Sequence, residues 1–372
     1  MSYMPSSLEL VGWPAWSTLF WFSLASGVLI LVKRSSGHQK GAFQESNVHA
    51  EPTAYPPVEP LPDFEWQTKE PLKLRPFKPK YNLTMAIEEA TVSELIEMDK
   101  NYADRIALRK ALMTDHPETV LGAEQCVAAA VNEFYSWMVE TYLPTRFPRM
   151  FRLSPPFKPS ILHNLVTNEK LPLRAVGHPI ETLRVLGGLV DEDVLFLLPS
   201  DDGDGYTLKG FVTCFPNGFN TKEKLNVKLR DIHKPVPKYK EKLEKSMDRY
   251  FDKLKVGKFM KRANWTITTT PNLAFFQGTH LYEGDTVSQE EVNVENARFR
   301  CERQVVHRLP QSRAIILTIK TYLYTLSEIK GEGLGESLAQ AIDGLREGNV
   351  PAFHFYKRAA IWGESAKAYL RN

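Results

Sequence analysis

The sequence predicts an α+β domain that follows a single N-terminal transmembrane helix. Three observations lead to this prediction. The stretch 11–32 contains no charged residue, residues 35–80 are polar and then rich in proline, and helical patterns are followed by β-branched strands. Helices that come first, followed by antiparallel strands with a helix between them, are typical of α+β architecture. We therefore expect a short tail over residues 1–10, a membrane helix over 11–32, a tether over 33–80 and a folded domain over 81–372.

The composition is that of a globular protein with no bias toward nucleic acid. The 372 residues are 43% hydrophobic and 24% charged, and the net charge is +3. Such a chain can bury a sizeable core, and its nearly balanced charge does not suggest a nucleic-acid partner. The three cysteines Cys126, Cys214 and Cys301 are too far apart for a disulfide framework or a zinc site. We expect them to be free thiols in a reducing compartment.

The uncharged stretch Val11–Val32 is long enough to span a bilayer. A helix of this length covers about 33 Å, against about 30 Å for the hydrocarbon core. A cleaved signal peptide is the alternative, but it would begin with basic residues, and none precede this stretch. Because Lys33 and Arg34 follow the span, the positive-inside rule predicts a single-pass protein with its domain in the cytosol. The expected location is the endoplasmic reticulum or another endomembrane.

The tether and the domain can be divided by composition and periodicity. The Pro-rich tether cannot fold alone, but the aromatic pair within Asp63–Trp66 is expected to dock onto the domain. Apolar residues at helical spacing predict helices over 93–113, 122–142, the start of 180–198, 237–254, 336–345 and 352–370. Alternating and β-branched residues predict strands over the end of 180–198, 206–215, 264–270, 299–306 and 314–322.

His233 is the predicted metal ligand. It lies in the sequence Ile232–Pro237, where two prolines stiffen the backbone. A neutral imidazole is a ligand that haem iron accepts. Asp231 is close enough in sequence to orient the ring, although a local capping role is equally open. An ordinary surface or capping histidine is the alternative, and His307 and His280 are the next candidates.

Four further residues are candidates to bind an anionic cofactor: Arg262, Trp265, Arg303 and Arg308. A buried arginine needs a carboxylate or an anionic ligand, so haem propionates and a structural Glu–Arg pair are both open. Arg262 and Trp265 could hold a propionate or stack on each other. Because side chains alternate along a strand, we expect Glu302 and Gln304 on one face and Arg303 on the other.

Asp202 and Asp204 support a different hypothesis. An Asp-x-Asp pair can hold a divalent cation and a nucleotide-sugar diphosphate, which with an anchor and a stalk would indicate a lumenal glycosyltransferase. The surrounding sequence DDGDG is also typical of a turn between strands. The basic pair that follows the predicted span favours the opposite orientation. The sequence contains no Gly-rich phosphate loop after a strand, no nucleophile elbow and no His-Glu-x-x-His.

A set of short motifs resembles one family. The motifs are Tyr102–Arg109, Tyr142–Pro148, Asp191–Asp193, Cys214–Pro216, Lys224–Leu225, Ile232–Pro237, Arg262–Trp265, Glu302–Gln304, Arg308–Ser312 and Thr318–Tyr322. Each is weak alone, but in combination they make the chain similar to the alpha subunit of haem-dependent oxidative N-demethylase and its fungal relatives. The resemblance covers about Tyr81 to Tyr324.

The resemblance implies a PAS-like antiparallel sheet that holds haem b, with His233 as the iron ligand. It implies a monooxygenase-type reaction in which O₂ is used to remove a methyl group from a small amine or an amine-containing metabolite, releasing formaldehyde. Electrons would come from NADPH through separate flavin and iron–sulfur partners. A non-enzymatic haem sensor is the alternative, because PAS-like folds commonly sense.

Three positions depart from the family's pattern. Phe219 stands where the family usually has Trp, and Asn226 and Arg313 stand where it usually has Gly. We expect the bulky cation at Arg313 to reshape the mouth of the pocket. Haem binding is therefore expected to carry over to this chain more faithfully than the family's dimethylamine substrate.

Overall fold

The computed structural model describes residues 53–155, 160–175, 177–287 and 291–372. The chain divides into two compact units between His49 and Ala50, and all described residues belong to the second unit. The predicted span 11–32 and the first part of the tether lie outside the described residues and stay predictions. Among the residues described, no helix is long and apolar enough to cross a membrane.

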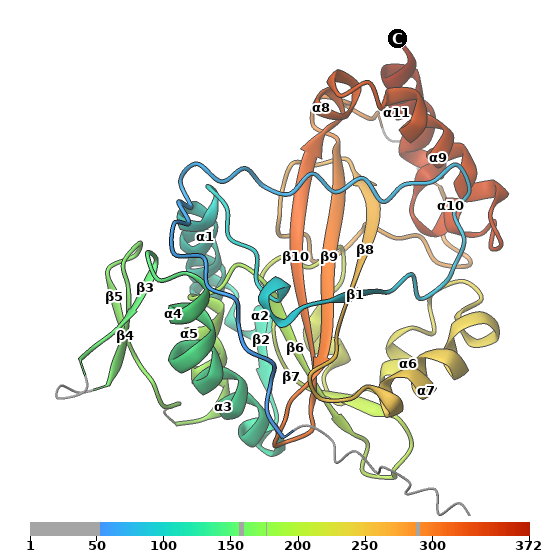
Figure 1. The fold of residues 1–372 in the computed structure, drawn as a ribbon. Coiled ribbons are helices and arrows are strands. Elements are labelled where there is room, and N and C mark those ends of the chain that lie inside the picture. Colours follow the sequence, from blue (N-terminus) through green and yellow to red (C-terminus); the bar gives the residue numbers. More distant parts are fainter. Residues whose placement is uncertain (1–52, 156–159, 176, 288–290) are drawn as a thin grey trace, which may run out of the picture. The chain divides into compact units, whose positions relative to one another are not determined.

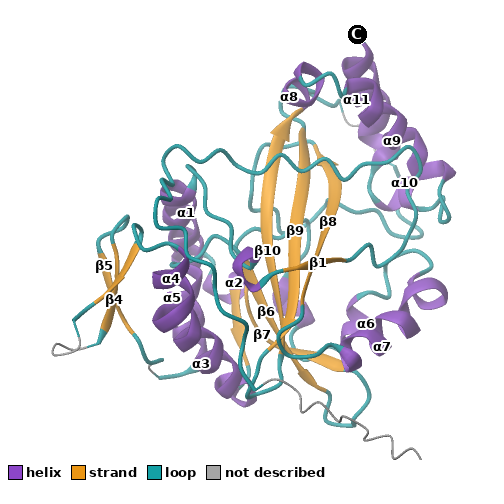
Figure 2. Ribbon diagram, in the orientation of Figure 1, coloured by secondary structure: helices purple, strands orange, loops and turns teal. Residues whose placement is uncertain are grey.

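A seven-stranded antiparallel sheet forms the centre of the described unit (Figures 1 and 2). Its order is β1-β8-β9-β10-β6-β7-β2. The strands are β1 (Glu88–Ala90), β2 (Leu121–Ala123), β6 (Asp193–Pro199), β7 (Tyr206–Val212), β8 (Phe259–Thr268), β9 (Arg298–Arg308) and β10 (Ile315–Thr325). The long central strands are rich in β-branched and aromatic residues, which fit a pleated surface. A second sheet contains β3 (Phe151–Leu153), β4 (Ile161–Asn164) and β5 (Glu169–Pro172).

Helices surround the large sheet, as the α+β prediction requires. Figure 1 shows α1, α3, α4 and α5 grouped between the two sheets, and α8, α9 and α11 gathered near one end of β9 and β10. The helices are α1 (Tyr102–Asp115), α2 (Pro117–Val120), α3 (Ala128–Trp137), α4 (Leu143–Arg146), α5 (Pro179–Gly187), α6 (Leu229–Ile232), α7 (Lys245–Lys253), α8 (Leu326–Gly331), α9 (Gly335–Glu347), α10 (Phe353–Tyr356) and α11 (Ala359–Arg371). A π-helical turn, Lys240–Glu244, leads directly into α7.

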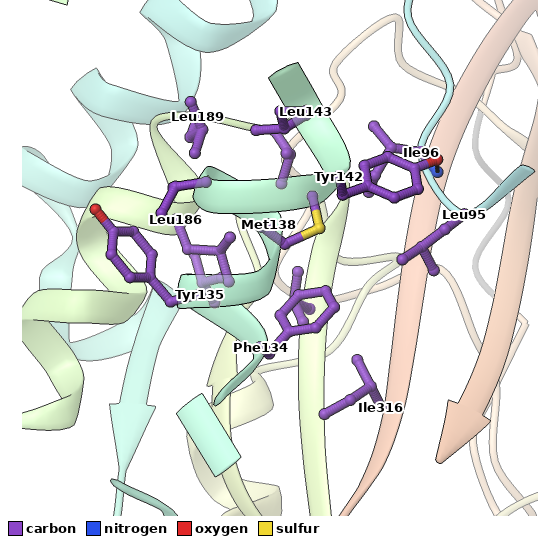
Figure 3. Packing of buried hydrophobic residues seen from close by; sticks show 14 of the residues in the cluster. Leu95, Ile96, Phe134, Tyr135, Met138, Tyr142, Leu143, Leu186, Leu189 and Ile316 are labelled. Carbon is purple, nitrogen blue, oxygen red and sulfur yellow. Dashed lines mark hydrogen bonds between the residues drawn. The ribbon is translucent and has the colours of Figure 1, made fainter. Parts of the chain in front are cut away.

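Buried apolar side chains form two clusters around the sheet. In the first, Phe134 and Met138 lie close to Ile316 of β10 and Leu95 (Figure 3). The Tyr142 hydroxyl is buried with them, donates to the Ser93 carbonyl at 3.1 Å and accepts from the Ile96 amide at 3.1 Å. The second cluster joins the other end of the sheet to α7 and the C-terminal helices. The described domain is thus held by packing on both faces of one sheet.

The described part of the predicted tether, residues 53–80, packs along the domain. Tyr55, Phe64 and Trp66 pack against the first cluster, and Leu72 and Phe77 pack against the second. The expected docking of the aromatic pair within Asp63–Trp66 is therefore confirmed. Packing against the domain begins well before residue 81, where the sequence placed the start of the domain.

Two departures from the family's pattern fall on left-handed backbone. Asn226 has a φ of 65° and Arg313 a φ of 63°. Glycine adopts this region at no steric cost, which gives a physical reason for glycine at both positions in relatives. Asn tolerates the region better than other residues, whereas Arg313 is expected to cost about 1 kcal/mol relative to glycine. Arg313 lies in the turn between β9 and β10, where its carbonyl accepts from Arg308 at 2.8 Å.

Candidate functional site

One face of the large sheet is incompletely covered at its centre. Residues that pair directly across antiparallel strands share a face, so Arg262 of β8, Gln304 of β9 and Ile319 of β10 lie in one row. Their side chains are half-buried, as are those of four neighbours on the same face. We call these seven residues the open face: Leu195, Met260, Arg262, Gln304, Leu317, Ile319 and Leu323. Half-buried leucine and isoleucine at the middle of a central strand indicate a surface that a ligand could cover.

Buried polar atoms without a partner lie beside the open face. Glu302 and Thr321 pair across β9 and β10 on this face, and Arg300 and Thr266 pair across β9 and β8. Within the described residues, the Thr321 and Thr266 hydroxyls and the Nε atoms of Arg262 and Arg300 have no hydrogen-bond partner. An unpaired buried polar group costs on the order of 1–3 kcal/mol. The row is therefore suited to a polar ligand that would satisfy these atoms.

Cations lie near Glu302, a buried carboxylate of this face, while the other buried carboxylate there, Asp193, is paired with Arg109 at 2.6 Å. Glu302 accepts a hydrogen bond from Gln304 at 3.0 Å. Burial lowers the pKa of Lys357 to about 7 and that of Lys224 to about 8, while the charge of Glu302 acts to raise both. Burial also lowers the pKa of Arg300 to about 10. Several cations near one carboxylate leave a positive surplus, which favours an anionic ligand here.

The loop Thr213–Phe219 lies against this row and is fixed by backbone contacts. Arg300 donates to the carbonyls of Phe215 at 2.6 Å and Leu273 at 2.9 Å. Gly218 has a φ of 73°, and a Cβ added there would lie 1.8 Å from the Thr279 hydroxyl. Any larger residue would thus strain the backbone and overlap Thr279, so this position requires glycine.

Phe219 follows this glycine and packs against a site cation. Its ring centroid lies 3.6 Å from the Lys224 Nζ, a cation–π contact. The departure from the family's Trp thus falls beside Lys224. Phe219 keeps an aromatic ring at this position, although its ring is smaller than that of Trp.

His233, the predicted metal ligand, lies at the end of α6, and one of its ring nitrogens is engaged by the backbone. Its Nδ1 lies 2.8 Å from the Leu229 carbonyl, so in the neutral ring Nδ1 donates and Nε2 keeps its lone pair. Burial lowers the pKa of His233 to about 4, and the charges of Lys224 and Arg262 add to this effect. The ring stacks on Tyr239 with centroids 5.2 Å apart. The structure therefore brings His233, Arg262 and Lys224 into one electrostatic environment.

The backbone, and not Asp231, orients this ring. Asp231 forms an ion pair with Lys234 at 2.7 Å, whereas the hydrogen bond to His233 comes from the Leu229 carbonyl. Of the two roles that the sequence left open for Asp231, its contacts fit the local one.

The structure does not place Arg303 and Arg308 with His233, Arg262 and Lys224. Within the described residues, Trp265 meets the site cations only through Lys357, whose ammonium donates to the Trp265 carbonyl and lies 5.5 Å from its ring centroid. Trp265 pairs with Cys301 on the opposite face of the sheet, where its ring stacks on Phe299 with centroids 5.5 Å apart. Arg303 also lies on that face, as expected, and contacts the Glu94 carbonyl and, at 3.5 Å, the Glu97 carboxylate. These contacts make both residues part of the packing behind the site.

Arg308 is used by the fold at the far end of β9. It donates to the Leu254 carbonyl at 2.6 Å, to the Tyr206 hydroxyl at 2.8 Å and to the carbonyls of Phe251 and Arg313. Its guanidinium thus ties the end of α7 to the turn after β9. A propionate would have to displace these contacts.

The other two histidines have different surroundings. His307 is fully buried, stacks on Phe259 with centroids 4.8 Å apart, and belongs to the face opposite the site. His280 stacks on Tyr356 with centroids 4.5 Å apart, and burial lowers its pKa to about 3, assisted by the charges of Lys357 and Lys224. His280 is therefore near the site cations.

Asp202 and Asp204 lie in an exposed turn and are neutralised by the protein itself. Lys228 contacts Asp202 at 2.5 Å, and Arg230 contacts Asp204 at 2.7 Å. In the described part of the chain, no group of three or more His, Cys, Asp or Glu side chains could hold a metal ion. These contacts favour the turn interpretation of DDGDG.

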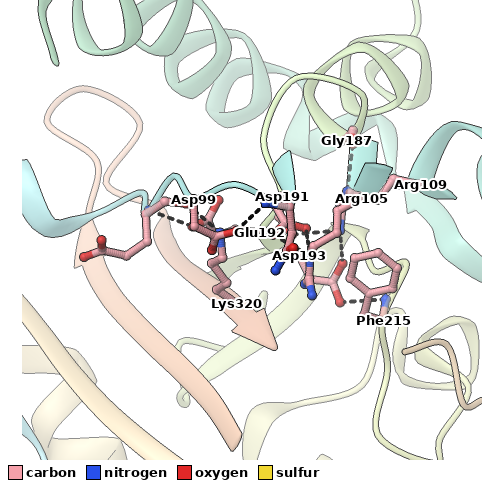
Figure 4. A network of polar contacts seen from close by, with 11 residues as sticks. Asp99, Arg105, Arg109, Gly187, Asp191, Glu192, Asp193, Phe215 and Lys320 are labelled. Atoms are coloured by element: carbon pink, nitrogen blue, oxygen red, sulfur yellow. Dashed lines mark hydrogen bonds and ion pairs between the residues drawn. The ribbon is translucent and has the colours of Figure 1, made fainter. Parts of the chain in front are cut away.

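Several of the family motifs converge on a buried ionic network next to the site (Figure 4), where Asp193 pairs with Ile319 of the open face. Arg109 donates to the Asp193 carboxylate at 2.6 Å and to the Gly187 carbonyl at 2.7 Å. Asp193 in turn accepts from the amides of Cys214 at 2.7 Å and Phe215 at 3.0 Å. The network therefore holds the loop that lies against the site, which explains why motifs remote in sequence occur together.

A second part of the network surrounds Lys320. Its ammonium lies 3.0 Å from Asp99 and 3.1 Å from Asp191, and Asp191 also contacts Arg105 at 2.6 Å. The neighbouring Glu192 accepts from the Glu97 amide at 2.9 Å. Burial, with the charge of Asp191, raises the pKa of Glu192 to about 7, although Lys320 and Arg303 oppose the shift.

Glu192 is expected to make the domain less stable as the pH rises through neutrality. Its pKa is about 7 in the folded state and 4.5 in the reference state, so the folded chain binds the proton more tightly. The resulting stability is fully present below the lower pKa and is lost as the pH rises through the higher one. Between pH 5 and about 7.5 the unfolding free energy of the wild type, relative to Glu192→Gln, should fall by about 2 kcal/mol.

Chemical denaturation at several pH values measures this difference. Glu283→Gln, at an exposed position, is the control and should leave the pH profile unchanged. Parallel profiles for the wild type and Glu192→Gln would show that Glu192 does not titrate in this range.

Sequence reasoning missed most of the residues that line the site. Glu302 was assigned to a strand face but not to a site, and Arg300, Thr321 and Lys357 were not singled out. The alternation in β9 contains a usable signal, because Arg300, Glu302 and Gln304 place three polar groups on one face of a central strand. Lys357 gives no such signal, because only the fold brings the C-terminal region to β8, where it contacts Asn264 at 3.2 Å.

The fold is that of an α+β protein whose large antiparallel sheet carries a row of unpartnered polar atoms on one face. Residues 86–367 match the sequence model of the family described as haem-dependent oxidative N-demethylase, alpha subunit-like. The chain belongs to this family. Membership implies a haem-dependent oxidative enzyme of the N-demethylase type, and the words alpha subunit-like imply a partner subunit or reductase.

Proposed function

We propose that the domain binds haem b on the open face in a PAS-like manner, with His233 as the iron ligand, and catalyses oxidative N-demethylation of an amine. The observation that carries this proposal is the unpartnered polar row, one member of which, Arg262, acts electrostatically on His233. That row combines the Glu302 carboxylate with a surplus of cations, and it adjoins half-buried apolar side chains of central strands.

The residues present fit a haem. The half-buried Leu195, Leu317 and Ile319 offer an apolar surface for a flat macrocycle. The unpartnered Nε of Arg262 and the Lys224 ammonium are suited to propionate carboxylates. The Nε2 of His233 is unprotonated at neutral pH because burial holds the pKa of the ring at about 4. When bound, haem supplies the activation of O₂.

The reaction balance defines what else the protein needs. A methylamine, O₂, two electrons and two protons give the demethylated amine, formaldehyde and water. Among the described residues, no cluster of ligands would hold a metal centre for electron storage. The two electrons are therefore proposed to come from NADPH through a separate flavin and iron–sulfur partner.

We assign substrate positioning to Glu302. A buried carboxylate that accepts one hydrogen bond, from Gln304, can accept another from a substrate ammonium. Binding the ammonium would offset the charge of Glu302 and hold the methyl group close to the cofactor. Lys357 and Lys224, whose pKa values lie at about 7 and about 8, can exchange protons with the site near neutral pH.

The test of cofactor binding uses the full-length chain, supplied with haem, and its His233→Ala variant. The wild type is expected to show a Soret band, and the variant is expected to lose it or to shift it by loss of the axial nitrogen. His163→Ala, at a histidine on β4, is the matched control and should bind haem like the wild type. An unchanged spectrum in His233→Ala would assign the ligand to another residue, with His280 next because it lies near Lys224 and Lys357.

A haem sensor is the second candidate, because the open face alone would serve a sensor as well as an enzyme. Formaldehyde release with a surrogate reductase separates the two. Turnover of any member of a panel of methylated amines supports the enzyme. Tight binding of gaseous ligands without formaldehyde across that panel would support the sensor.

A further inference from the structure

The net positive charge of the segment Lys234–Lys258 is larger than that of the whole chain. It has nine Lys or Arg residues and four Asp or Glu residues, a surplus of five, whereas the chain as a whole has a net charge of +3. The segment includes α7 and the π-helical turn before it. A concentration of one sign of charge on one element indicates an interaction surface.

Four basic side chains of this helix share one side. Lys242, Lys245, Arg249 and Lys253 recur at spacings of three and four residues, so they lie along one side, which we call the basic stripe. Leu243 and Met247 form the buried side. Asp248 is on neither side and contacts Arg230 at 2.9 Å. Asp248 is thus engaged by the domain, whereas the exposed Asp252, three residues after Arg249, lies beside the basic stripe and offsets part of its charge.

The basic stripe is exposed and unpaired in the part of the chain that the structure describes. All four side chains are exposed, and none forms an ion pair with a described residue. The exposed large hydrophobic residues of the described chain are Leu108, Leu153, Tyr282 and Val287, none of them on this helix. A membrane-surface helix would present apolar residues next to its cations, so the surface favours an acidic protein over a lipid bilayer.

The helix that carries the basic stripe also contacts the predicted iron ligand. Tyr239, the residue that precedes the π-helical turn, stacks on the His233 ring with centroids 5.2 Å apart. Its hydroxyl lies 3.5 Å from the Met247 sulfur on the buried side of α7. A protein docked on the basic stripe would therefore lie over the element that adjoins the proposed haem.

We propose that the basic stripe is the docking surface for an acidic electron-transfer protein, which delivers the two electrons of each turnover one at a time. Each electron leaves the reduced centre of the docked partner and enters the cofactor site beside His233, so the partner is oxidised once per electron. The proposal rests on the proposed function. It assigns a separate surface to the reductant, distinct from the open face that would hold haem and amine.

The test measures binding of an acidic plant-type ferredoxin, as the probe, to the full-length chain in phosphatidylcholine nanodiscs. The four-fold variant Lys242→Glu, Lys245→Glu, Arg249→Glu and Lys253→Glu is expected to weaken binding at least about tenfold. The matched control reverses four exposed cations elsewhere: Lys78, Lys80, Arg152 and Lys170. Both variants change the net charge equally, so the control should change binding less than about threefold. Wild-type binding should weaken with added salt.

Each other outcome overturns the proposal. Equal weakening of binding in both variants would show a general charge effect. If the wild type does not bind ferredoxin, or if the stripe variant binds it as well as the wild type, the basic stripe is not the docking surface. If the stripe variant loses binding to phosphatidylserine vesicles but ferredoxin binding is unaffected, the stripe is a membrane contact. Ferredoxin binding does not require haem, so the binding test and the haem test are independent. Absence of a Soret band would contradict the proposed function without deciding whether ferredoxin binds the basic stripe.

Discussion

Replacing Arg109 by alanine is expected to destabilise the domain by about 3–5 kcal/mol. The guanidinium is fully buried, and it contacts the Asp193 carboxylate at 2.6 Å and the Gly187 carbonyl at 2.7 Å. Its removal leaves a buried carboxylate without its counter-ion and a carbonyl without its donor. Since natural domains are stable by only about 5–15 kcal/mol, much of the variant should be unfolded or aggregated in cells. Denaturant titration of the purified chain, followed by tryptophan fluorescence, measures the loss.

Arg152→Ala is the control for this substitution. Arg152 is exposed on β3, and removing it should change the unfolding free energy by less than about 0.5 kcal/mol. A loss below about 1 kcal/mol for Arg109→Ala would show that water replaces the guanidinium at Asp193. In that case the network would not be what holds the loop Thr213–Phe219.

Changing Glu302 to glutamine is expected to lower turnover of a methylated amine by about a hundredfold or more, while the Soret band stays. The substitution keeps the shape of the side chain and its contact with Gln304 but removes the charge that would bind a substrate ammonium. Loss of the negative charge should also lower the pKa of Lys357 further, because Glu302 acts to raise it. Formaldehyde release gives the rate, and amine-dependent spectral shifts give binding.

Two results separate a role in positioning from a structural one. The amine should bind to Glu302→Gln much more weakly than to the wild type, while the unfolding midpoint stays close to the wild-type value. Glu118→Gln, at an exposed carboxylate, should have neither effect. Full activity in Glu302→Gln would assign the amine to another acceptor and remove Glu302 from the proposal.

The elements with strong periodicity were predicted well, and the short ones were not. The strands β6, β7, β9 and β10 and the helix α5 lie close to the predicted ranges, because β-branched runs and turn signals define them. The predicted helix 122–142 begins instead with β2, Leu121–Ala123, since pairing with β7 overrides the helical preference of an alanine-rich stretch. Likewise, the helix expected over 352–370 is interrupted at Arg358, which has a φ of 60°.

Less of the site than of the fold could be predicted. The His233 environment follows from local sequence, because the carbonyl that fixes the ring is only four residues away. The separation of Arg303 from Glu302 followed from strand alternation. The assignments of Trp265 and Arg308 to the site could not be checked locally, because the contacts of both residues come from segments distant in sequence. Lys357 could not be predicted for the same reason, because only the fold brings it near Arg262 and Glu302.

Because residues 53–80 pack on the domain, the folded domain is longer than the region that matches the family. The family match begins at residue 86, yet Tyr55, Phe64 and Trp66 contribute aromatic side chains to the first core cluster. Phe64 alone packs on Phe147 with ring centroids 5.1 Å apart. A recombinant fragment trimmed to the matched region would expose these apolar contacts and is expected to aggregate. For expression of a soluble fragment, the useful boundary therefore lies before Thr53, more than thirty residues upstream of the one that homology alone would select.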